Sequence, residues 1–218
     1  MSYAIMRVEK LKGDLNGIGK HIDRSFQGEN CSPNNSNANQ VTDNLHWDNK
    51  GSIFSQNEWT EYTKINHLKK RVNDHIKENY KVDRAIRKDA VKCVEYLFTS
   101  DTQKMNDIFS DAKIYEEWIR DNREFLADIY GKENIISMHL HTDETTYHME
   151  VVVVPITSDG RLSAKEFING KKDLSNQQTV YAERMEKYGM QRGIKGSSAR
   201  HIAPKNLNKT QNYERNSH

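Results

Sequence analysis

The sequence predicts an α+β domain in which an antiparallel β-sheet carries flanking helices. Short β-rich stretches alternate with longer segments of helical periodicity, and residues 135–141 and 147–156 form two strand-like runs separated only by the acidic turn TDETT. Strands joined by so short a turn pair antiparallel, and strands mixed with helices in this way pack as a sheet with a helical layer. The 218 residues suffice for one substantial core.

The first half of the chain mixes strands, helices and one polar loop. In order, we predict a strand at 3–8, a helix at 12–26, a loop at 27–44, a helix at 55–80, a basic amphipathic segment at 82–91 and a strand at 93–100. Asp14 is the expected N-cap of the first helix, which Gly17 and Gly19 weaken. Ser55, followed three residues later by Glu58, predicts a capping box at the start of the second helix.

The second half contains the longest predicted helix and the two adjacent strands. We predict a helix at 102–130, strands at 135–141 and 147–156, a tight turn at 158–160, a helix at 174–188 and a glycine-rich basic segment from 190 onward. Gly131 and Gly189 follow the two helices at the position where a helix commonly stops.

Charge and cysteine content limit the class of protein. The net charge is +2, but residues 161–218 hold 12 Lys/Arg against 5 Asp/Glu, a net +7 that leaves −5 for the rest. A basic C-terminal third favours a polyanionic partner or a solvated tail. The sequence contains no apolar run approaching the ~20 residues of a membrane helix and no signal-peptide pattern. Cys31 and Cys93 are too few for a disulfide framework, so we expect a cytoplasmic protein.

The run HLHTDETTYHMEVVVVP, residues 139–155, predicts a metal site. Because side chains alternate along a strand, His148 and Glu150 share one face, and His139 and His141 share a face of the preceding strand. We therefore expect His141, His148 and Glu150 to bind a divalent cation, with His139 as an alternative ligand. No cysteine lies nearby, which favours an open, catalytic site over a closed structural one. Idle, solvated residues at a hairpin tip are the alternative interpretation.

Two acids lie in the turn between the predicted ligands. Asp143 or Glu144 could orient a histidine or accept a proton as general base. Both could equally be ordinary acids of a turn.

Three separated motifs and the N-terminal strand resemble one known family. The segment HTDETTYHME at 141–150 resembles the His-x-Asp-Glu-x-Thr-Pro-His-x-His signature of the Mob/Pre plasmid mobilisation relaxases (MobV type), which are HUH nucleases. KHIDR at 20–24 resembles the nucleophile motif of that family, RAIRKDAV at 84–91 its basic box, and MSYAIMRVEKLK its N-terminal strand. The resemblance extends from the start of the chain to about residue 200.

The resemblance implies an HUH relaxase-like fold and a DNA-nicking strand transferase. Such an enzyme nicks one strand at a plasmid's origin of transfer, stays attached to the 5′ phosphate and later rejoins the strand. His21 is then the nucleophile that forms a phosphoramidate, Arg24 holds a phosphate, and Glu144, in preference to Asp143, handles the His21 proton. The expected cofactor is Mn²⁺ or Mg²⁺, acting as a Lewis acid.

The sequence departs from the family signature at two positions. Glu150 replaces the third histidine and shifts the metal preference towards harder cations, and Tyr147 replaces the proline. We expect residues 1–200 to form the relaxase domain and 201–218 a basic polar tail that begins a linker to a C-terminal region. Expected partners are single-stranded or supercoiled plasmid DNA, a conjugative coupling protein, and a second copy through that C-terminal region, in a bacterial cytoplasm.

Basic side chains outside the motif centre are candidates for DNA phosphate contacts. The predicted DNA-binding residues are Arg84, Arg87, Lys88, Lys171, Lys172, Lys195 and Arg200, with Lys69, Lys70 and Arg71 as a further cluster. Trp47 and Tyr62 either stack on bases or belong to the core.

Three other functions compete with the relaxase interpretation. A rolling-circle replication initiator would use a tyrosine, with Tyr181 first and Tyr188 second as candidates. A non-catalytic DNA-binding repressor would use the metal structurally. A small-substrate metallohydrolase would leave the basic C-terminal third unexplained.

Overall fold

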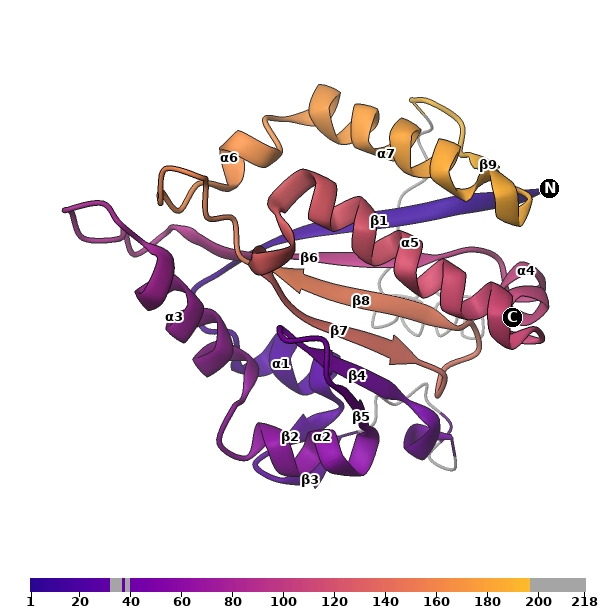
Figure 1. The fold of residues 1–218 in the computed structure, drawn as a ribbon, viewed down its shortest axis with the longest axis horizontal. Helices are drawn as coiled ribbons and strands as arrows, with labels where there is room; N and C mark the ends of the chain where they lie inside the picture. The colour runs from indigo at the N-terminus through magenta and orange to yellow at the C-terminus, as the bar shows by residue number, and fades with distance from the viewer. Residues whose placement is uncertain (32–36, 38–39, 197–218) are drawn as a thin grey trace, which may run out of the picture.

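A seven-stranded sheet organises the part of the chain that is described. The computed structural model describes residues 1–31, 37 and 40–196. The strand order is β5-β4-β7-β8-β6-β1-β9, with every pairing antiparallel except the parallel β1–β9 contact (Figure 1). The strands are β1 (Ser2–Lys12), β4 (Leu45–Asp48), β5 (Ile53–Ser55), β6 (Val91–Thr99), β7 (Ile135–His141), β8 (His148–Val153) and β9 (Met190–Arg192), while β2 (Ser25–Phe26) and β3 (Glu29–Asn30) form a separate pair. This confirms the predicted α+β class.

Helices cover both faces of the sheet. They are α1 (Asn16–Asp23), α2 (Gln56–Thr63), α3 (Leu68–Asn79), α4 (Thr102–Phe109), α5 (Ala112–Tyr130), α6 (Ala164–Phe167) and α7 (Lys171–Met185), with short 3₁₀ turns η1 (Val41–Asp43), η2 (Lys132–Asn134) and η3 (Glu186–Tyr188). In Figure 1, α5 crosses the central strands and α7 runs beside β1. Within the described residues, no helix has the length and apolar character needed to cross a bilayer.

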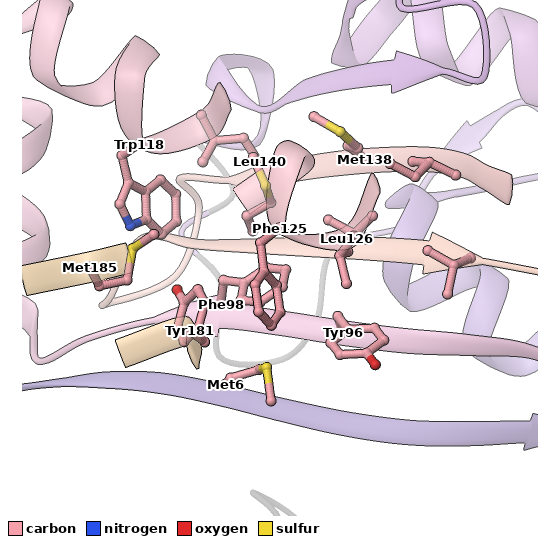
Figure 2. Close-up of a cluster of buried hydrophobic side chains, with 14 of the residues drawn as sticks. Met6, Tyr96, Phe98, Trp118, Phe125, Leu126, Met138, Leu140, Tyr181 and Met185 are labelled. Atoms are coloured by element: carbon pink, nitrogen blue, oxygen red, sulfur yellow. The ribbon is translucent and has the colours of Figure 1, made fainter. Parts of the chain in front are cut away.

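Two apolar clusters, one on each face, hold the layers together. The larger lies under α5 and α7 and includes Tyr96, Phe98, Trp118, Phe125 and Tyr181 (Figure 2). The smaller packs α1 and α3 on the other face and includes Leu15, Ile22, Leu68, Val72 and Val152. Because side chains alternate along β8, the strand supplies valines to the larger cluster and His148 and Glu150 to the face that α1 covers.

Each of the two long predicted helices is divided into two. The helix at 55–80 begins with the predicted capping box, but it stops at Thr63, and α3 restarts where His67 accepts a hydrogen bond from the Lys70 backbone. The helix at 102–130 is interrupted before Asp111, whose carboxylate caps α5. Helical periodicity continues through such breaks, whereas the caps within the runs decide where each helix ends.

The first helix and the neighbouring hairpin also differ from prediction. Asp14 is not an N-cap: α1 begins at Asn16, and the Asp14 carboxylate lies 3.1 Å from the Lys69 ammonium. The β4–β5 hairpin was not predicted, although Gly51, at φ +84°, occupies its turn. Trp47 on β4 is buried in the larger cluster, which confirms the core alternative for this residue.

Two further segments are compared with their predictions. In the basic amphipathic segment predicted at 82–91, residues 81–90 are irregular and β6 begins at Val91. The region 27–44 contains η1 and the short strand β3 within its described residues. Tyr62 is half-buried and stacks on Trp59, with 4.9 Å between ring centroids.

Candidate metal and nucleophile site

The antiparallel register of β7 and β8 gathers the predicted ligands. His141 lies opposite His148, and His139 lies opposite Glu150, all on the sheet face that α1 covers. His141 and Glu150 are 0 % and 1 % exposed, and His148 is buried at the rim. Nitrogen and oxygen atoms of His141, His148 and Glu150 all lie within 4.8 Å of one another. The strand pairing therefore brings together the three side chains that the sequence selected.

Hydrogen bonds set the tautomers of the two histidines. His141 Nε2 lies 3.0 Å from the Ile22 carbonyl, and His148 Nδ1 lies 3.0 Å from the Thr146 carbonyl. Carbonyl oxygens only accept, so both of these nitrogens carry hydrogens in the neutral rings. The remaining nitrogens, His141 Nδ1 and His148 Nε2, then direct lone pairs at each other across 3.2 Å.

The donor set fits a divalent cation. Glu150 Oε2 is buried and makes no hydrogen bond within the described residues, although it lies 3.7 Å from His141 Nδ1. Opposed lone pairs beside an unsatisfied carboxylate oxygen are unfavourable unless a positive charge lies among them. Burial and the charge of Arg24 hold the pKa of His141 well below its usual range, which keeps the ring a neutral donor. Two imidazoles and a carboxylate suit a borderline or hard first-row cation.

His21 extends from the last turn of α1 towards this donor set. Its Nε2 lies 3.4 Å from Glu150 Oε1, and 43 % of its side chain is exposed. The hydrogen bond with Glu150 raises the pKa of His21, while partial burial and the Arg24 charge lower it. Burial alone would raise the pKa of Glu150, but the hydrogen bond from His21 and nearby positive charges bring it below its usual range. The predicted nucleophile is thus adjacent to the predicted metal ligands.

Arg24 differs from its predicted placement. The sequence placed it within the predicted helix at 12–26, but it is the C-cap of α1, in a left-handed conformation at φ 48°. Its side chain is fully buried, with Nη2 2.6 Å from Glu144 Oε1, Nε 3.1 Å from Asp143 Oδ2, and Nη1 2.7 Å from the His21 carbonyl. This geometry favours orientation of His21 over direct contact with a phosphate, because the donors face protein acceptors. A strained backbone residue at such a position is typical of functional sites.

Asp143 and Glu144 hold Arg24. Asp143 is fully buried, and Glu144 is partly exposed at the mouth of the site. The carboxylate in ion-pair contact with His21 is Glu150, so the predicted role of Glu144 as proton acceptor has no direct geometric support and stays a prediction.

His139, the alternative ligand, belongs to a buried network behind the site. Its Nδ1 lies 2.8 Å from His46 Nδ1, and its Nε2 lies 2.8 Å from Ser137 Oγ. His46 in turn contacts Gln56, and burial lowers the pKa of His46 to about 3. His139 is not among the ligand group found in the described residues, so the alternative is not supported.

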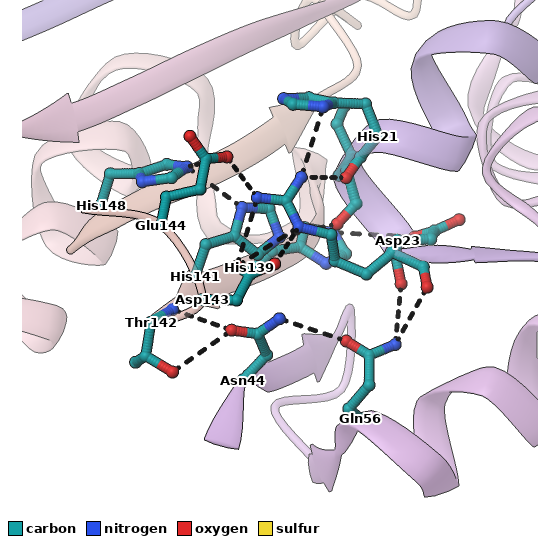
Figure 3. A network of polar contacts seen from close by, with 12 residues as sticks. His21, Asp23, Asn44, Gln56, His139, His141, Thr142, Asp143, Glu144 and His148 are labelled. Carbon is teal, nitrogen blue, oxygen red and sulfur yellow. Dashed lines mark hydrogen bonds and ion pairs between the residues drawn. The ribbon is translucent and has the colours of Figure 1, made fainter. Parts of the chain in front are cut away.

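Several residues of this network were missed by sequence analysis. Asn44 Oδ1 accepts the Thr142 backbone N–H at 2.8 Å and so ties the acidic turn to the start of β4 (Figure 3). Gln56 Nε2 donates to the Asp23 carbonyl at 3.2 Å, which ties the end of α1 to the start of α2. Single Asn and Gln residues have no characteristic spacing that marks them as part of a site. Only a prediction of the β4–β5 hairpin, which the sequence analysis missed, would have indicated them.

The predicted cluster at 69–71 is divided between one buried arginine and two surface lysines. Arg71 is buried, with Nη2 2.8 Å from Asp23 Oδ1 and its guanidinium carbon 4.9 Å from the Trp59 ring centroid. On the surface, Lys69 forms an ion pair with Asp14 and Lys70 with Asp74. Arg71 therefore positions the helix that carries His21.

The other predicted DNA-binding cations lie on the surface. Exposed members are Arg84, Arg87, Lys88, Lys171, Lys172 and Lys195. Arg84 and Arg87 line a cleft of about 620 Å³ together with Lys10, Lys12 and Arg161, at the end of the sheet where β1 finishes and β6 begins. Arg200 lies outside the described residues.

The tyrosines of the competing mechanism are not placed for catalysis. Tyr181 is fully buried in the larger cluster, on the sheet face opposite the histidines. Tyr188 is also buried, and its hydroxyl lies 2.6 Å from Asp121 Oδ2. The prediction of Tyr181 or Tyr188 as an alternative nucleophile is therefore wrong.

The chain is similar to known plasmid recombination enzymes. Plasmid recombination enzymes type 1 and type 3 of Staphylococcus aureus are 37 % and 38 % identical over 195 and 202 residues. Each alignment covers 88 % of this chain but only 45 % and 44 % of the relative, so the chain spans less than half of their length. A plasmid recombination enzyme of Streptococcus agalactiae is 33 % identical over 204 residues, covering 92 % of this chain and 38 % of the relative.

Solved structures with the same fold are relaxase domains. The Mn-bound MobM relaxase domain in complex with plasmid pMV158 oriT DNA superposes with a TM-score of 0.78 at 28 % identity, over 95 % of this chain and 99 % of that one. A second complex of MobM with oriT DNA gives 0.77 at 28 % identity, over 95 % and 98 %. The Mob_Pre family, described as plasmid recombination enzyme, matches residues 1–209. The family model covers most of the chain and the relatives are more than 30 % identical over most of it, so the chain belongs to the Mob_Pre family of plasmid recombination enzymes.

Proposed function

We propose that this chain is the relaxase domain of a plasmid mobilisation protein and nicks one DNA strand at a plasmid's origin of transfer. The observation that carries the proposal is the 3.4 Å contact between His21 Nε2 and Glu150 Oε1, which sets a nucleophile beside a three-ligand metal site. The manganese and oriT DNA named for the MobM relaxase domain support it.

His21 is the nucleophile of the proposed reaction. Its imidazole nitrogen attacks the scissile phosphorus, a P–N bond forms, and the P–O bond to the 3′ oxygen breaks. The phosphoramidate keeps the 5′ phosphate attached until a 3′ hydroxyl displaces His21 and rejoins the strand. A cation held by His141, His148 and Glu150, Mn²⁺ or Mg²⁺, would withdraw charge from a non-bridging phosphate oxygen.

Arg24 prepares His21 for this reaction. Its donors contact the His21 carbonyl and lie 3.3 Å from His21 Nδ1, while Asp143 and Glu144 anchor the guanidinium. Exposed cations bind the DNA phosphates, and the cleft lined by Arg84 and Arg87 brings several of them together with Lys10, Lys12 and Arg161.

Trapping of a covalent adduct tests the proposal. The protein is incubated with Mn²⁺ and labelled single strands from the transfer origin of its own plasmid, and adducts are resolved by denaturing gel and mapped by mass spectrometry. We expect an acid-labile adduct on His21 that His21→Ala abolishes. His67→Asn is the matched control, since Asn can keep the cap that His67 provides to α3. Bound DNA without any adduct would favour the repressor interpretation instead.

The cellular setting follows from the same proposal. A relaxase domain of this kind acts in the bacterial cytoplasm on single-stranded or supercoiled plasmid DNA. A conjugative coupling protein and a homodimer formed through a C-terminal region are the proposed protein partners. The longer relatives, of which this chain covers less than half, support a further region of this kind.

A further inference from the structure

Side chains from other elements satisfy the carbonyl groups at the end of α1. The last four carbonyls of any helix have no partner within the helix. In α1, the Ile22 carbonyl lies 3.0 Å from His141 Nε2. The next two accept from one amide, because Gln56 Nε2 lies 3.2 Å from the Asp23 carbonyl and 3.4 Å from the Arg24 carbonyl. Long-range contacts therefore hold the end of the helix that carries the proposed nucleophile.

The contacts of Gln56 fix the orientation of its amide (Figure 3). Carbonyl oxygens only accept, so the amide nitrogen faces α1 and the amide oxygen faces the opposite side. That oxygen lies 2.9 Å from His46 Nε2 on β4 and 3.5 Å from Asn44 Nδ2. Asn44 Oδ1 in turn accepts the Thr142 backbone N–H at 2.8 Å. One amide thus connects the end of α1 to the residues that hold the acidic turn.

The backbone that carries Gln56 is well anchored. Gln56 is fully buried and is the first residue of α2, directly after Ser55, which forms the capping box with Glu58. One turn later, Trp59 Nε1 donates to Asp23 Oδ1 at 3.1 Å and docks the same helix on α1. The amide therefore belongs to a fixed element rather than to a loop.

Arg24 needs support of this kind because its backbone is left-handed, at φ 48°. That conformation is unfavourable for a residue with a Cβ. Gln56 Nε2 contacts the carbonyls on both sides of the strained residue, so both contacts require the left-handed turn. A right-handed continuation of α1 would carry the guanidinium away from Asp143 and Glu144.

We propose that Gln56 is a positioning residue, which holds the left-handed end of α1 and so keeps the Arg24 guanidinium in contact with His21. Arg24 Nη1 lies 2.7 Å from the His21 carbonyl, and this contact depends on where the C-cap places the arginine. The inference rests on the proposed function and adds to it a fully buried residue that acts through Arg24.

Exchange of the Arg24 Nε–H hydrogen tests the proposal without DNA or metal. Exchange rates in the full chain are compared by NMR for wild type, Gln56→Met and Thr63→Val. Methionine has a similar length but no amide donor. Thr63→Val is the matched control, because it removes buried hydroxyl contacts with Ser25 and the Thr60 carbonyl at the other end of α2. We expect exchange at least about tenfold faster in Gln56→Met, through local opening, and unchanged in Thr63→Val.

The rate of adduct formation tests the consequence for the nucleophile. Single-turnover rates are measured with Mn²⁺ and a saturating single strand from the transfer origin, well below the melting temperatures, and DNA affinity is measured separately. We expect Gln56→Met to form the adduct at least about tenfold more slowly with unchanged DNA affinity, since a displacement of about 1 Å can cost on the order of 100-fold. Thr63→Val should match wild type in both. A role in stability alone would leave both rates unchanged at this temperature.

The two measurements separate the inference from the proposed function. Arg24 exchange that stays slow in Gln56→Met, an adduct rate equal to wild type, or an equal loss in Thr63→Val overturns the positioning role. A wild-type chain that binds DNA and forms no adduct refutes the proposed function, while Arg24 exchange still decides whether Gln56 holds Arg24. If Gln56→Met does not fold, Gln56→Glu replaces it with the same expected results, since it keeps the acceptor for His46 and loses the amide donor.

Discussion

Arg24 is the residue whose removal should have the largest structural effect on the site. Its guanidinium and the Asp143 carboxylate form an ion pair in which both side chains are 0 % exposed. Removing one partner of a buried pair leaves the other charge uncompensated and costs about 3–5 kcal/mol. For a chain of this size, Arg24→Ala should therefore lower the melting temperature by about 6–20 °C.

Two matched variants separate the contributions of charge and backbone. Arg24→Gly also loses the guanidinium but relieves the left-handed backbone, so it should be more stable than Arg24→Ala by about 1 kcal/mol. Combining Arg24→Ala with Asp143→Asn removes both charges and should recover about 2 kcal/mol or more of the loss.

Urea unfolding followed by circular dichroism measures all four proteins, with midpoints compared at equal m-values. An Arg24→Ala protein within about 1 kcal/mol of wild type would refute the reasoning, because Asp143 would then not depend on the guanidinium. A double variant no more stable than Arg24→Ala would refute it equally.

Three other expectations can be checked. Tyr181→Phe should still form the DNA adduct, as checked by denaturing gels. Its melting temperature should equal or exceed that of wild type, because the Tyr181 hydroxyl is buried without a hydrogen bond in the described residues. Burial, and secondly the charge of Glu150, raises the pKa of Glu95 from 4.5 to about 9. Between these pH values Glu95 is ionised in the unfolded chain but neutral in the folded one, so the free energy of unfolding falls as pH rises. Glu95→Gln should remove this slope, which is up to about 1.4 kcal/mol per pH unit, in unfolding experiments at a series of pH values. Replacing Arg84 and Arg87 by Ala should reduce the slope of log affinity for single-stranded DNA against log salt by about 1.4, and an unchanged slope would remove both from the interface.

Local patterns were enough to predict which candidate ligands lie together but not what surrounds them. The alternation in HMEVVVV places His148 and Glu150 on one face whatever the rest of the chain does, because the side-chain period of a strand is two. The breaks at His67 and Asp111 escaped prediction because a polar side chain within a periodic run is either a surface residue or a cap, and only the backbone conformation distinguishes them.

The roles of Arg24 and Arg71 depended on the tertiary structure. The sequence suggested that both arginines contact DNA phosphates. In the structure they are buried, Arg24 against Asp143 and Arg71 against Asp23, and they support α1. Acids 119 and 48 positions away in the chain carry no local signal of such pairing. The exclusion of Tyr181 likewise required knowing which face of the sheet α7 covers.

The sequence by itself determined the class of fold, the family and the candidate ligands and nucleophile, since these depend on short-range periodicity and on motifs in order along the chain. Only the tertiary structure decided the tautomers of His141 and His148, the burial of Arg24, and the contact between Glu150 and His21. The physical reason is that each of these depends on where α1 packs against β7 and β8, which is set by apolar contacts among Ile22, Leu68 and Val152 that join segments far apart in the chain.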